Sequence, residues 1–314
     1  MCIKMADGSA PVLGTTLDLV ASFMNHSCNP AAFVFFEGRQ MRVRALRSLR
    51  AGEEITQTYV DLSGSVFSRQ ATTKAEYFFQ CNCVRCEDEL ADLQQKERGG
   101  LDLMQLRSAQ ERLLDLANHA GHPYNSTDVY QELSALEADV RAIIRDAFVS
   151  GVWPPGMSPM PLVLKTFSQI CKAKGDSAGA LRYSLEATLS LRDRKGSLWA
   201  HMLFDAVQNL SFLIQSNAYD ISGEDGGLSE DVCWNVLHAY LGELKQAATQ
   251  VYGPDSAYTQ SIVDWYSRAV NAAQPPRPGT RRFVRVYNAS QATMLRWAGI
   301  EESRGISIST PGHV

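Results

Sequence analysis

Four cysteines constrain this chain more than any other feature of its sequence. Cys81, Cys83 and Cys86 form a Cys-x-Cys-x2-Cys run, and Cys28 lies far away in a polar Asn-His-Ser-Cys segment. The run places three soft thiolates near one point, which suits tetrahedral zinc and leaves one ligand to come from elsewhere. We predict that Cys28 supplies this ligand, so that one metal ion joins two distant segments.

The alternative for this cluster is a set of reduced thiols without a metal, which we disfavour because so dense a group of free cysteines invites oxidation. The chain has seven cysteines, and Cys2, Cys171 and Cys233 are scattered. This pattern favours a reducing, intracellular compartment over a disulfide framework. The first residues lack a basic region followed by an uninterrupted apolar stretch, and no apolar run reaches spanning length, so we expect neither a signal peptide nor a transmembrane helix. We expect the nucleus, the cytoplasm or both as the location.

The composition sets broad limits on the class of protein. The 314 residues are enough for two domains with separate cores, and the formal net charge of -4 gives no reason to expect direct nucleic-acid binding. The hydrophobic and charged fractions, 45% and 20%, are those of a globular protein.

The N-terminal part of the chain has strand-like sequence patterns and the remainder has helical periodicity, and together they predict an α+β fold. Residues 32–36 and 40–45 flank a Glu-Gly turn and read as a hairpin, and residues 54–60 read as a further β-branched strand. Residues 69–78 read as a short helix that leads into the cysteine run. We therefore assign residues 1–88 to a small β-rich domain, residues 89–300 to a helical domain and residues 301–314 to a flexible tail.

The helical half is predicted from apolar residues at helical spacing. A Trp-Pro-Pro-Gly sequence at 153–156 interrupts the pattern. Successive helix pairs of this length favour stacking similar to tetratricopeptide repeats, although the signature residues of that repeat are absent. The helices are expected within residues 101–116, 129–144, 181–191, 198–213, 232–251 and 258–270.

Taken in order, these motifs resemble the C-terminal half of a SET domain, and the nearest likeness is to the SET-and-MYND family and its fungal relatives. The motifs are the Asn-His-Ser-Cys segment at 25–28, a hairpin that ends in Val-Arg-Ala at 43–45, the Gly-Glu-Glu-Ile strand at 52–55 with Tyr59, and the Cys-x-Cys-x2-Cys segment at 81–86. The likeness covers roughly residues 12–88. The helical half also fits, since members of this family carry a C-terminal helical domain similar to tetratricopeptide repeats.

The resemblance implies a function and a role for each matching residue. It implies a protein-lysine methyltransferase that uses S-adenosylmethionine, with a histone or another protein as substrate and a possible peptide partner in the helical domain. Tyr59 would be the active-site tyrosine, Asn25, His26 and Phe79 would bind the cofactor, and Tyr77 would line the lysine channel. Cys28, Cys81, Cys83 and Cys86 would hold the structural zinc that follows the SET domain.

Two departures from the family pattern lead to further expectations. Ala31 stands where the family usually has Asn, and no Gly-rich cofactor loop or MYND finger appears before Asn25. Three explanations stay open for the second departure: a truncated product of a longer methyltransferase, which we favour, a degenerate relative, or a partner chain that supplies the missing half. The alternative function is a catalytically inactive interaction protein that binds partners through its helical domain; a weaker reading is a zinc-stabilised scaffold.

Overall fold

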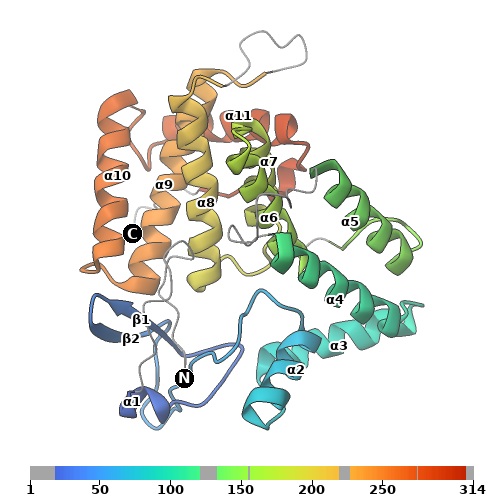
Figure 1. Cartoon of the computed structure of the whole chain (residues 1–314). Coiled ribbons are helices and arrows are strands. Elements are labelled where there is room, and N and C mark those ends of the chain that lie inside the picture. Colours follow the sequence, from blue (N-terminus) through green and yellow to red (C-terminus); the bar gives the residue numbers. More distant parts are fainter. Residues whose placement is uncertain (1–17, 121–132, 155, 219–226, 274, 309–314) are drawn as a thin grey trace.

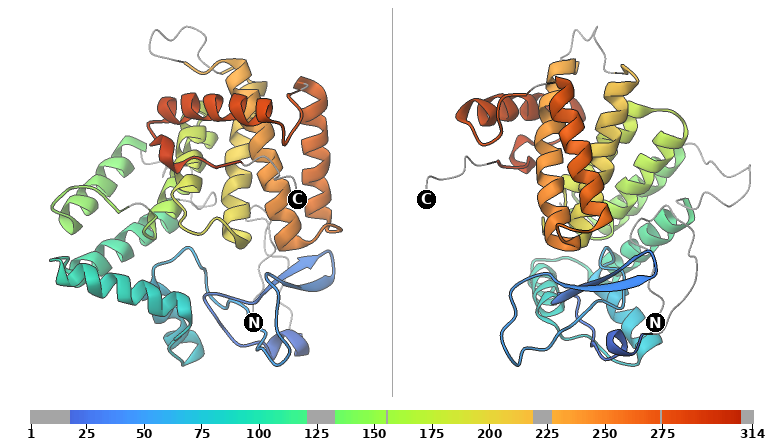
Figure 2. Two further views of the ribbon diagram at one scale, coloured as in Figure 1. Left: turned by 180° about the vertical axis from the view of Figure 1, so that it is seen from behind. Right: turned by 90° about the vertical axis from the view of Figure 1, so that its left-hand side faces the viewer.

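Figure 1 shows the computed structural model, which describes residues 18–120, 133–154, 156–218, 227–273 and 275–308. A small N-terminal part with one hairpin lies at one end of a larger set of helices, as the two views of Figure 2 confirm. This arrangement agrees with the predicted α+β class. Within the described residues, no helix is both long enough and apolar enough to cross a membrane.

The hairpin is confirmed. Strands β1 (Ala32–Glu37) and β2 (Gln40–Ala45) pair antiparallel, from Ala32 opposite Ala45 to Glu37 opposite Gln40. Gly38 has a φ of 58° in the turn, a conformation that favours glycine. The alternation of side chains between the two faces of the ribbon is therefore as the sequence indicated.

The further strand predicted over residues 54–60 is wrong, because this segment makes a single isolated bridge between Gln57 and His26. Its backbone groups bind two different segments. The Ser27 amide donates to the Gln57 carbonyl (2.9 Å), while the Ala32 amide donates to the carbonyl of the preceding residue, Thr56 (2.9 Å). Because its hydrogen bonds are divided between these two segments, residues 54–60 do not form the continuous row of paired hydrogen bonds that a strand requires. In the described residues the sheet thus has two strands.

The other described elements are helices. Polar caps fix several of their N-terminal ends: Ser65 caps α2, Asp176 caps α7, Ser229 caps α9 and Thr280 caps α11, each by accepting a backbone amide hydrogen. The helices are α1 (Leu19–Ser22), α2 (Val66–Tyr77), α3 (Val84–Arg98), α4 (Leu103–Ala120), α5 (Leu133–Ala147), α6 (Met160–Ala173), α7 (Ser177–Leu189), α8 (Gly196–Gln215), α9 (Glu230–Tyr252), α10 (Ala257–Ala273), α11 (Arg281–Ala298) and the 3-10 turn η1 (Glu302–Arg304).

The helices expected within residues 69–78, 101–116, 181–191, 198–213, 232–251 and 258–270 are confirmed as α2, α4, α7, α8, α9 and α10. The helix predicted over 129–144 is confirmed as α5 from Leu133 onward, and residues 129–132 lie outside the described residues. Helices α1, α3, α6 and α11 were not predicted. Consecutive helices from α6 to α10 pack against one another, and α11 packs on α9.

The described residues contain two large hydrophobic cores and a small third cluster of Leu164, Ala187 and Met202. The first, which we call the cysteine core, joins the cysteine segments to helices α3–α6; its larger buried members include Cys28, Val60, Val66, Cys81, Cys86, Leu93, Leu106, Leu113, Leu136, Val140, Ile143, Trp153, Val163, Phe167 and Ile170. The second, the helical core, lies among α7–α11; its members include Phe35, Leu181, Leu185, Trp199, Leu203, Val207, Leu210, Leu213, Cys233, Val236, Leu237, Tyr240, Leu241, Leu244, Val251, Tyr287, Leu295 and Ile306. Helix α3 runs without a break across residue 88, the predicted domain boundary.

The hairpin is fixed to the helical core by charges that match the ends of two helices. Arg44 donates from Nε to the Gln250 carbonyl (3.0 Å) and from Nη2 to the Thr249 carbonyl (3.2 Å) at the C-terminal end of α9. Glu37 accepts the Ala257 amide (2.5 Å) at the N-terminal end of α10. A cation therefore meets the negative end of one helix and an anion meets the positive end of the next.

Aromatic packing reinforces this contact. The Phe33 and Phe35 rings of β1 stand edge-on to Tyr252, with centroids 5.4 and 5.2 Å away. Gly253, which ends α9, has a φ of 92°, and a side chain there would come within 2.9 Å of the Arg44 guanidinium. The N-terminal part is therefore held at a defined position on the helices.

The start of the segment predicted as a flexible tail packs on α11. Ile306 is buried in the helical core, and its carbonyl accepts the Tyr287 hydroxyl (2.6 Å). The Gln291 side chain accepts the Ile306 amide (2.8 Å). Residues up to 308 thus have a defined place, and residues 309–314 lie outside the described residues.

Candidate metal centre and active site

The structure brings the four predicted cysteines together. Their sulfur atoms all lie within 4.8 Å of one another, although Cys28 is separated from the other three by more than fifty residues of chain. Cys28, Cys81 and Cys86 are buried, and Cys83 is half-buried. Four thiols at this separation match the donor set of a closed tetrahedral zinc site. The group is therefore compatible with zinc binding.

Local structure explains how the cysteines reach this position. Cys83 is the N-cap of α3, and Cys86 lies in its first turn, so the positive end of the helix faces the sulfur atoms. Cys81 is fixed by Gln70 of α2, whose side chain accepts the Cys81 amide (3.1 Å) and donates to the Cys81 carbonyl. Helices α2 and α3 thus hold one half of the site.

The thiols interact strongly with one another. Hydrogen bonds from Cys28 and Cys86 lower the pKa of Cys83 well below the ordinary thiol value. The same hydrogen bonding to Cys83 raises the pKa of Cys28, and burial raises it further. The group of four thiols therefore loses one proton readily and holds the others more tightly. A metal cation at its centre would replace the protons that the thiols share.

His26 connects the cysteines to the predicted active site. Its Nδ1 accepts the Tyr59 backbone amide (3.0 Å), and its Nε2 lies 3.3 Å from the Cys28 sulfur. Because Nδ1 accepts a hydrogen bond, the ring proton resides on Nε2 and points at the sulfur. Burial lowers the pKa of His26, which favours this neutral form. Both ring nitrogens are therefore engaged within the protein.

The aromatic residues predicted for the active site form one cluster. The Tyr59 ring lies 5.4 Å from His26 and 4.9 Å from Tyr77 between centroids, and Phe79 lies 5.7 Å from His26 and 6.5 Å from Tyr77. Two of these rings flank the C-terminal end of α2, and the other two come from segments that meet at the isolated bridge. All four are half-buried, so parts of their faces remain accessible.

The Tyr59 hydroxyl is anchored to the backbone. It donates to the Met24 carbonyl at 2.6 Å. Burial raises the pKa of Tyr59, and the neighbouring Tyr77 and Glu54 raise it further. The phenol therefore stays neutral at pH 7, and its oxygen keeps lone pairs that can accept a hydrogen bond.

The side chain of Asn25 is not part of this cluster. Its exposed side chain donates to Glu54 (2.6 Å), while its backbone carbonyl accepts the Gln57 amide (2.9 Å). The structure thus places Asn25 beside the aromatic residues through its backbone and leaves its amide group at the surface.

Sequence reasoning missed Arg69, which is only 2% exposed and contacts the sulfur atoms of Cys28 and Cys86. Its place in α2 carries one signal: Val66 and Thr73, three residues before it and four after it, are also buried, so Arg69 lies on the inward face of the helix. An arginine at such a position needs buried partners.

Comparison with known proteins finds a family match in the N-terminal part of the chain. Residues 4–60 match the SET domain family model. The N-terminal part of the chain is thus similar to a SET domain, and it resembles the SET-and-MYND methyltransferases. The match begins earlier than the likeness we expected from residue 12, and it ends before the cysteine run.

Three relatives show the extent of the likeness. The histone-lysine N-methyltransferase ASHR1 of Arabidopsis thaliana is 39% identical over 85 residues, which cover 27% of this chain and 18% of that protein. The histone-lysine N-methyltransferase SMYD3 of Mus musculus is 37% identical over 71 residues (23% and 17%). The SET domain and MYND-type zinc finger protein 6 of Schizosaccharomyces pombe is 30% identical over 116 residues (37% and 23%). The matched region thus spans about a fifth of the length of these relatives.

Proposed function

We propose that this chain carries the lysine-channel side of an S-adenosylmethionine-dependent protein-lysine methyltransferase. The observation that supports this proposal best is the cluster of Tyr59, Tyr77, Phe79 and His26, whose rings lie within 6.5 Å of their neighbours. The names of the relatives, which include histone-lysine and N-lysine methyltransferases, support the same reaction class. The substrate would be a lysine of a histone or of another protein.

The residues present suit both ligands of this reaction. Half-buried rings can stack on the adenine of the cofactor and can line a channel for an aliphatic lysine chain. The sulfonium of S-adenosylmethionine supplies an electrophilic methyl group when the cofactor is bound. We assign Phe79, His26 and Asn25 to the cofactor side, where His26 acts through the backbone of Tyr59 and the Cys28 sulfur.

The chemical task of the protein is to present a neutral, aligned amine. With an ordinary lysine pKa of about 10.4, deprotonation at pH 7 costs roughly 4–5 kcal/mol. Aromatic walls lower this cost because they remove water from the ammonium group. The neutral Tyr59 hydroxyl, held by Met24, can accept a hydrogen bond from the amine and orient it. We assign Tyr77 to the channel wall, since its ring lies 4.9 Å from that of Tyr59.

We propose that zinc occupies the group formed by Cys28, Cys81, Cys83 and Cys86. Four thiolates fill the coordination of a tetrahedral ion, so the metal has no open position for substrate. Its role would be structural: it fixes the segment of Cys28 and His26 against the start of α3, and thereby fixes the aromatic cluster.

Calorimetric titration with S-adenosylmethionine, followed by a methyl-transfer assay on histones and other lysine proteins, tests the proposal. We expect binding, and we expect Tyr59→Phe to reduce kcat by about tenfold or more with a smaller change in cofactor affinity. Tyr266→Phe on α10, which packs against the helical core, is the matched control and should change neither quantity.

The alternative function makes the opposite prediction. A catalytically inactive interaction protein would show intact zinc but no heat with the cofactor. Equal losses of kcat and cofactor affinity in Tyr59→Phe would instead assign Tyr59 a structural role.

A further inference from the structure

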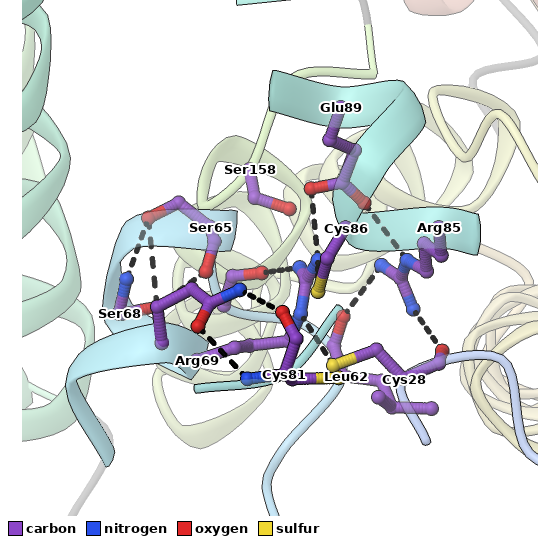
Figure 3. A network of polar contacts seen from close by, with 12 residues as sticks. Cys28, Leu62, Ser65, Ser68, Arg69, Cys81, Arg85, Cys86, Glu89 and Ser158 are labelled. Carbon is purple, nitrogen blue, oxygen red and sulfur yellow. Dashed lines mark hydrogen bonds and ion pairs between the residues drawn. The ribbon is translucent and has the colours of Figure 1, made fainter. Parts of the chain in front are cut away.

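Arg69 of α2 is almost fully buried, and its guanidinium lies among the sulfur atoms (Figure 3). Nε donates to the Cys28 sulfur at 3.3 Å, and Nη2 lies 3.8 Å from the Cys86 sulfur and 2.9 Å from a Glu89 oxygen. Nη1 donates to the Gly64 carbonyl at 2.7 Å. Each nitrogen of the planar fork thus has a partner.

The available carboxylate is not a full counter-charge for Arg69. Glu89 is partly exposed, and it also binds Arg85 through its second oxygen at 2.8 Å. Two arginines therefore share one carboxylate. Since an isolated buried cation is strongly unfavourable, additional negative charge must face Arg69, and the sulfur atoms of Cys28 and Cys86 are in position to provide it.

A metal site of this composition needs the same charge. Zinc bound by four thiolates carries two surplus negative charges, and burial makes that surplus costly. The Arg69 guanidinium is a permanent cation that offers directed hydrogen bonds to two of the four sulfurs. These two sulfurs belong to different segments, one at Cys28 and one in the first turn of α3.

We propose that Arg69 is a positioning residue for the cysteine site: it balances the charge of the bound tetrathiolate and holds the Cys28 sulfur against that of Cys86, and so slows release of the metal. This inference depends on the proposed zinc site. It does not depend on methyl transfer.

Arg85 provides a matched comparison within the same network. It binds the same Glu89, and it donates from Nη2 to the Leu62 carbonyl (3.0 Å) and from Nη1 to the Cys28 carbonyl (3.4 Å). It thus shares the carboxylate and approaches the backbone of Cys28, while the hydrogen bonds of its three guanidinium nitrogens are all to oxygen atoms. Removal of Arg85 changes the charge of the network and leaves the hydrogen bonds from Arg69 to sulfur in place.

The experiment compares metal release and metal spectra in the full chain. The wild type, Arg69→Met, Arg69→Lys and Arg85→Met are loaded with zinc, and transfer to a chromogenic chelator is followed in time. We expect release from Arg69→Met to be at least tenfold faster than from the wild type. Release from Arg85→Met should stay within about threefold of the wild-type rate. Arg69→Lys keeps the charge but loses the planar guanidinium, so its release rate should lie between those of Arg69→Met and the wild type.

Substitution with Co²⁺ provides a readout that a purely structural role would not change. Hydrogen bonds lower the energy of sulfur lone pairs, so their removal should shift the thiolate-to-cobalt charge-transfer bands of Arg69→Met to longer wavelength. The bands of Arg85→Met should stay in place. If Arg69→Met does not fold, the rate and bands of Arg69→Lys decide the question in the same way.

The outcomes separate the two proposals. If the wild type binds zinc but the Arg69 variants release it at the wild-type rate with unchanged bands, the role of Arg69 is overturned and the zinc site stands. If the wild type binds neither metal, the zinc proposal fails, and the role of Arg69 fails with it. Equal acceleration in Arg69→Met and Arg85→Met would show that net charge alone matters, which also overturns the positioning role.

Discussion

The cysteine core and the helical core are stabilised in different ways. Outside α3–α6, the cysteine core consists largely of irregular segments connected by sulfur, guanidinium and backbone contacts, with Arg69 at their centre. The helical core is a continuous set of leucine, valine and aromatic side chains between long helices. The first depends on a few specific polar contacts, and the second depends on many apolar contacts. The predicted active site belongs to the first.

Loss of the metal should have the largest effect, and it should be confined to one core. Structural zinc contributes about 10–16 kcal/mol of apparent binding free energy in zinc-finger peptides, so its removal can unfold a small region. We expect Cys83→Ser to abolish hydrogen-exchange protection around residues 76–90, with weaker protection in the rest of α3 and in α4, which share the cysteine core. Protection in α8 and α9 should persist.

Cys233→Ala is the control for this comparison, because Cys233 is fully buried in the helical core and lies outside the metal group. It should retain full metal content. Unchanged protection of residues 76–90 in Cys83→Ser would show that the segment folds without the metal.

A cavity in the helical core should have the next largest effect. Leu203 of α8 is fully buried, so Leu203→Ala should lower the free energy of unfolding by about 2–5 kcal/mol in a denaturant titration. Zinc content should remain that of the wild type, because Leu203 belongs to the helical core and not to the cysteine core. Phe212→Ala, on the same helix but 52% exposed, should cost less than about 1 kcal/mol. Zinc loss in Leu203→Ala without global unfolding would show that the zinc site depends on the packing of the helical core.

The sequence predicted those features whose signal is local or chemically unusual. The hairpin follows from alternation around Glu37-Gly38, and the four-cysteine group follows from ligand chemistry, although it joins distant segments. Most of the long helices follow from apolar periodicity. These signals are carried by the residues themselves.

The features that failed depend on partners that the local sequence does not identify. Residues 54–60 have strand-like residues, but a strand also needs neighbours, and these residues divide their hydrogen bonds between two segments. Helix α11 begins with Arg281-Arg282, which reads as surface loop, and its buried Phe283 and Tyr287 are meaningful only against the core. Arg69 could not be distinguished from a surface arginine without the position of the sulfurs.

The contact between the N-terminal part and the helices can be weakened by one substitution. Arg44→Met removes two hydrogen bonds to the C-terminal end of α9, and we expect a loss of about 1–2 kcal/mol in thermal or chemical unfolding. Arg39→Met at the exposed hairpin turn is the control and should stay within about 0.5 kcal/mol of the wild type. A loss as small as that of Arg39→Met would mean that the aromatic packing on Tyr252 holds the hairpin alone.

The smallest expected effect is a pH dependence in the helical core. His238 is buried, and desolvation lowers its pKa; its Nε2 lies 2.8 Å from the Ala269 carbonyl, and among the described residues its Nδ1 has no hydrogen-bond partner. Because the unfolded chain binds this proton more tightly, the contribution of His238 is complete above about pH 6.5 and is lost as the pH falls below that value, by about 1.4 kcal/mol for each unit of pKa depression.

We therefore expect the decline in unfolding free energy between pH 7.5 and 5.5 to be shallower in His238→Gln, whose amide can still donate to the Ala269 carbonyl. His26, whose pKa burial also lowers, is unchanged in this variant and accounts for part of the remaining slope. An identical slope in His238→Gln and the wild type would show that His238 does not contribute to the acid sensitivity.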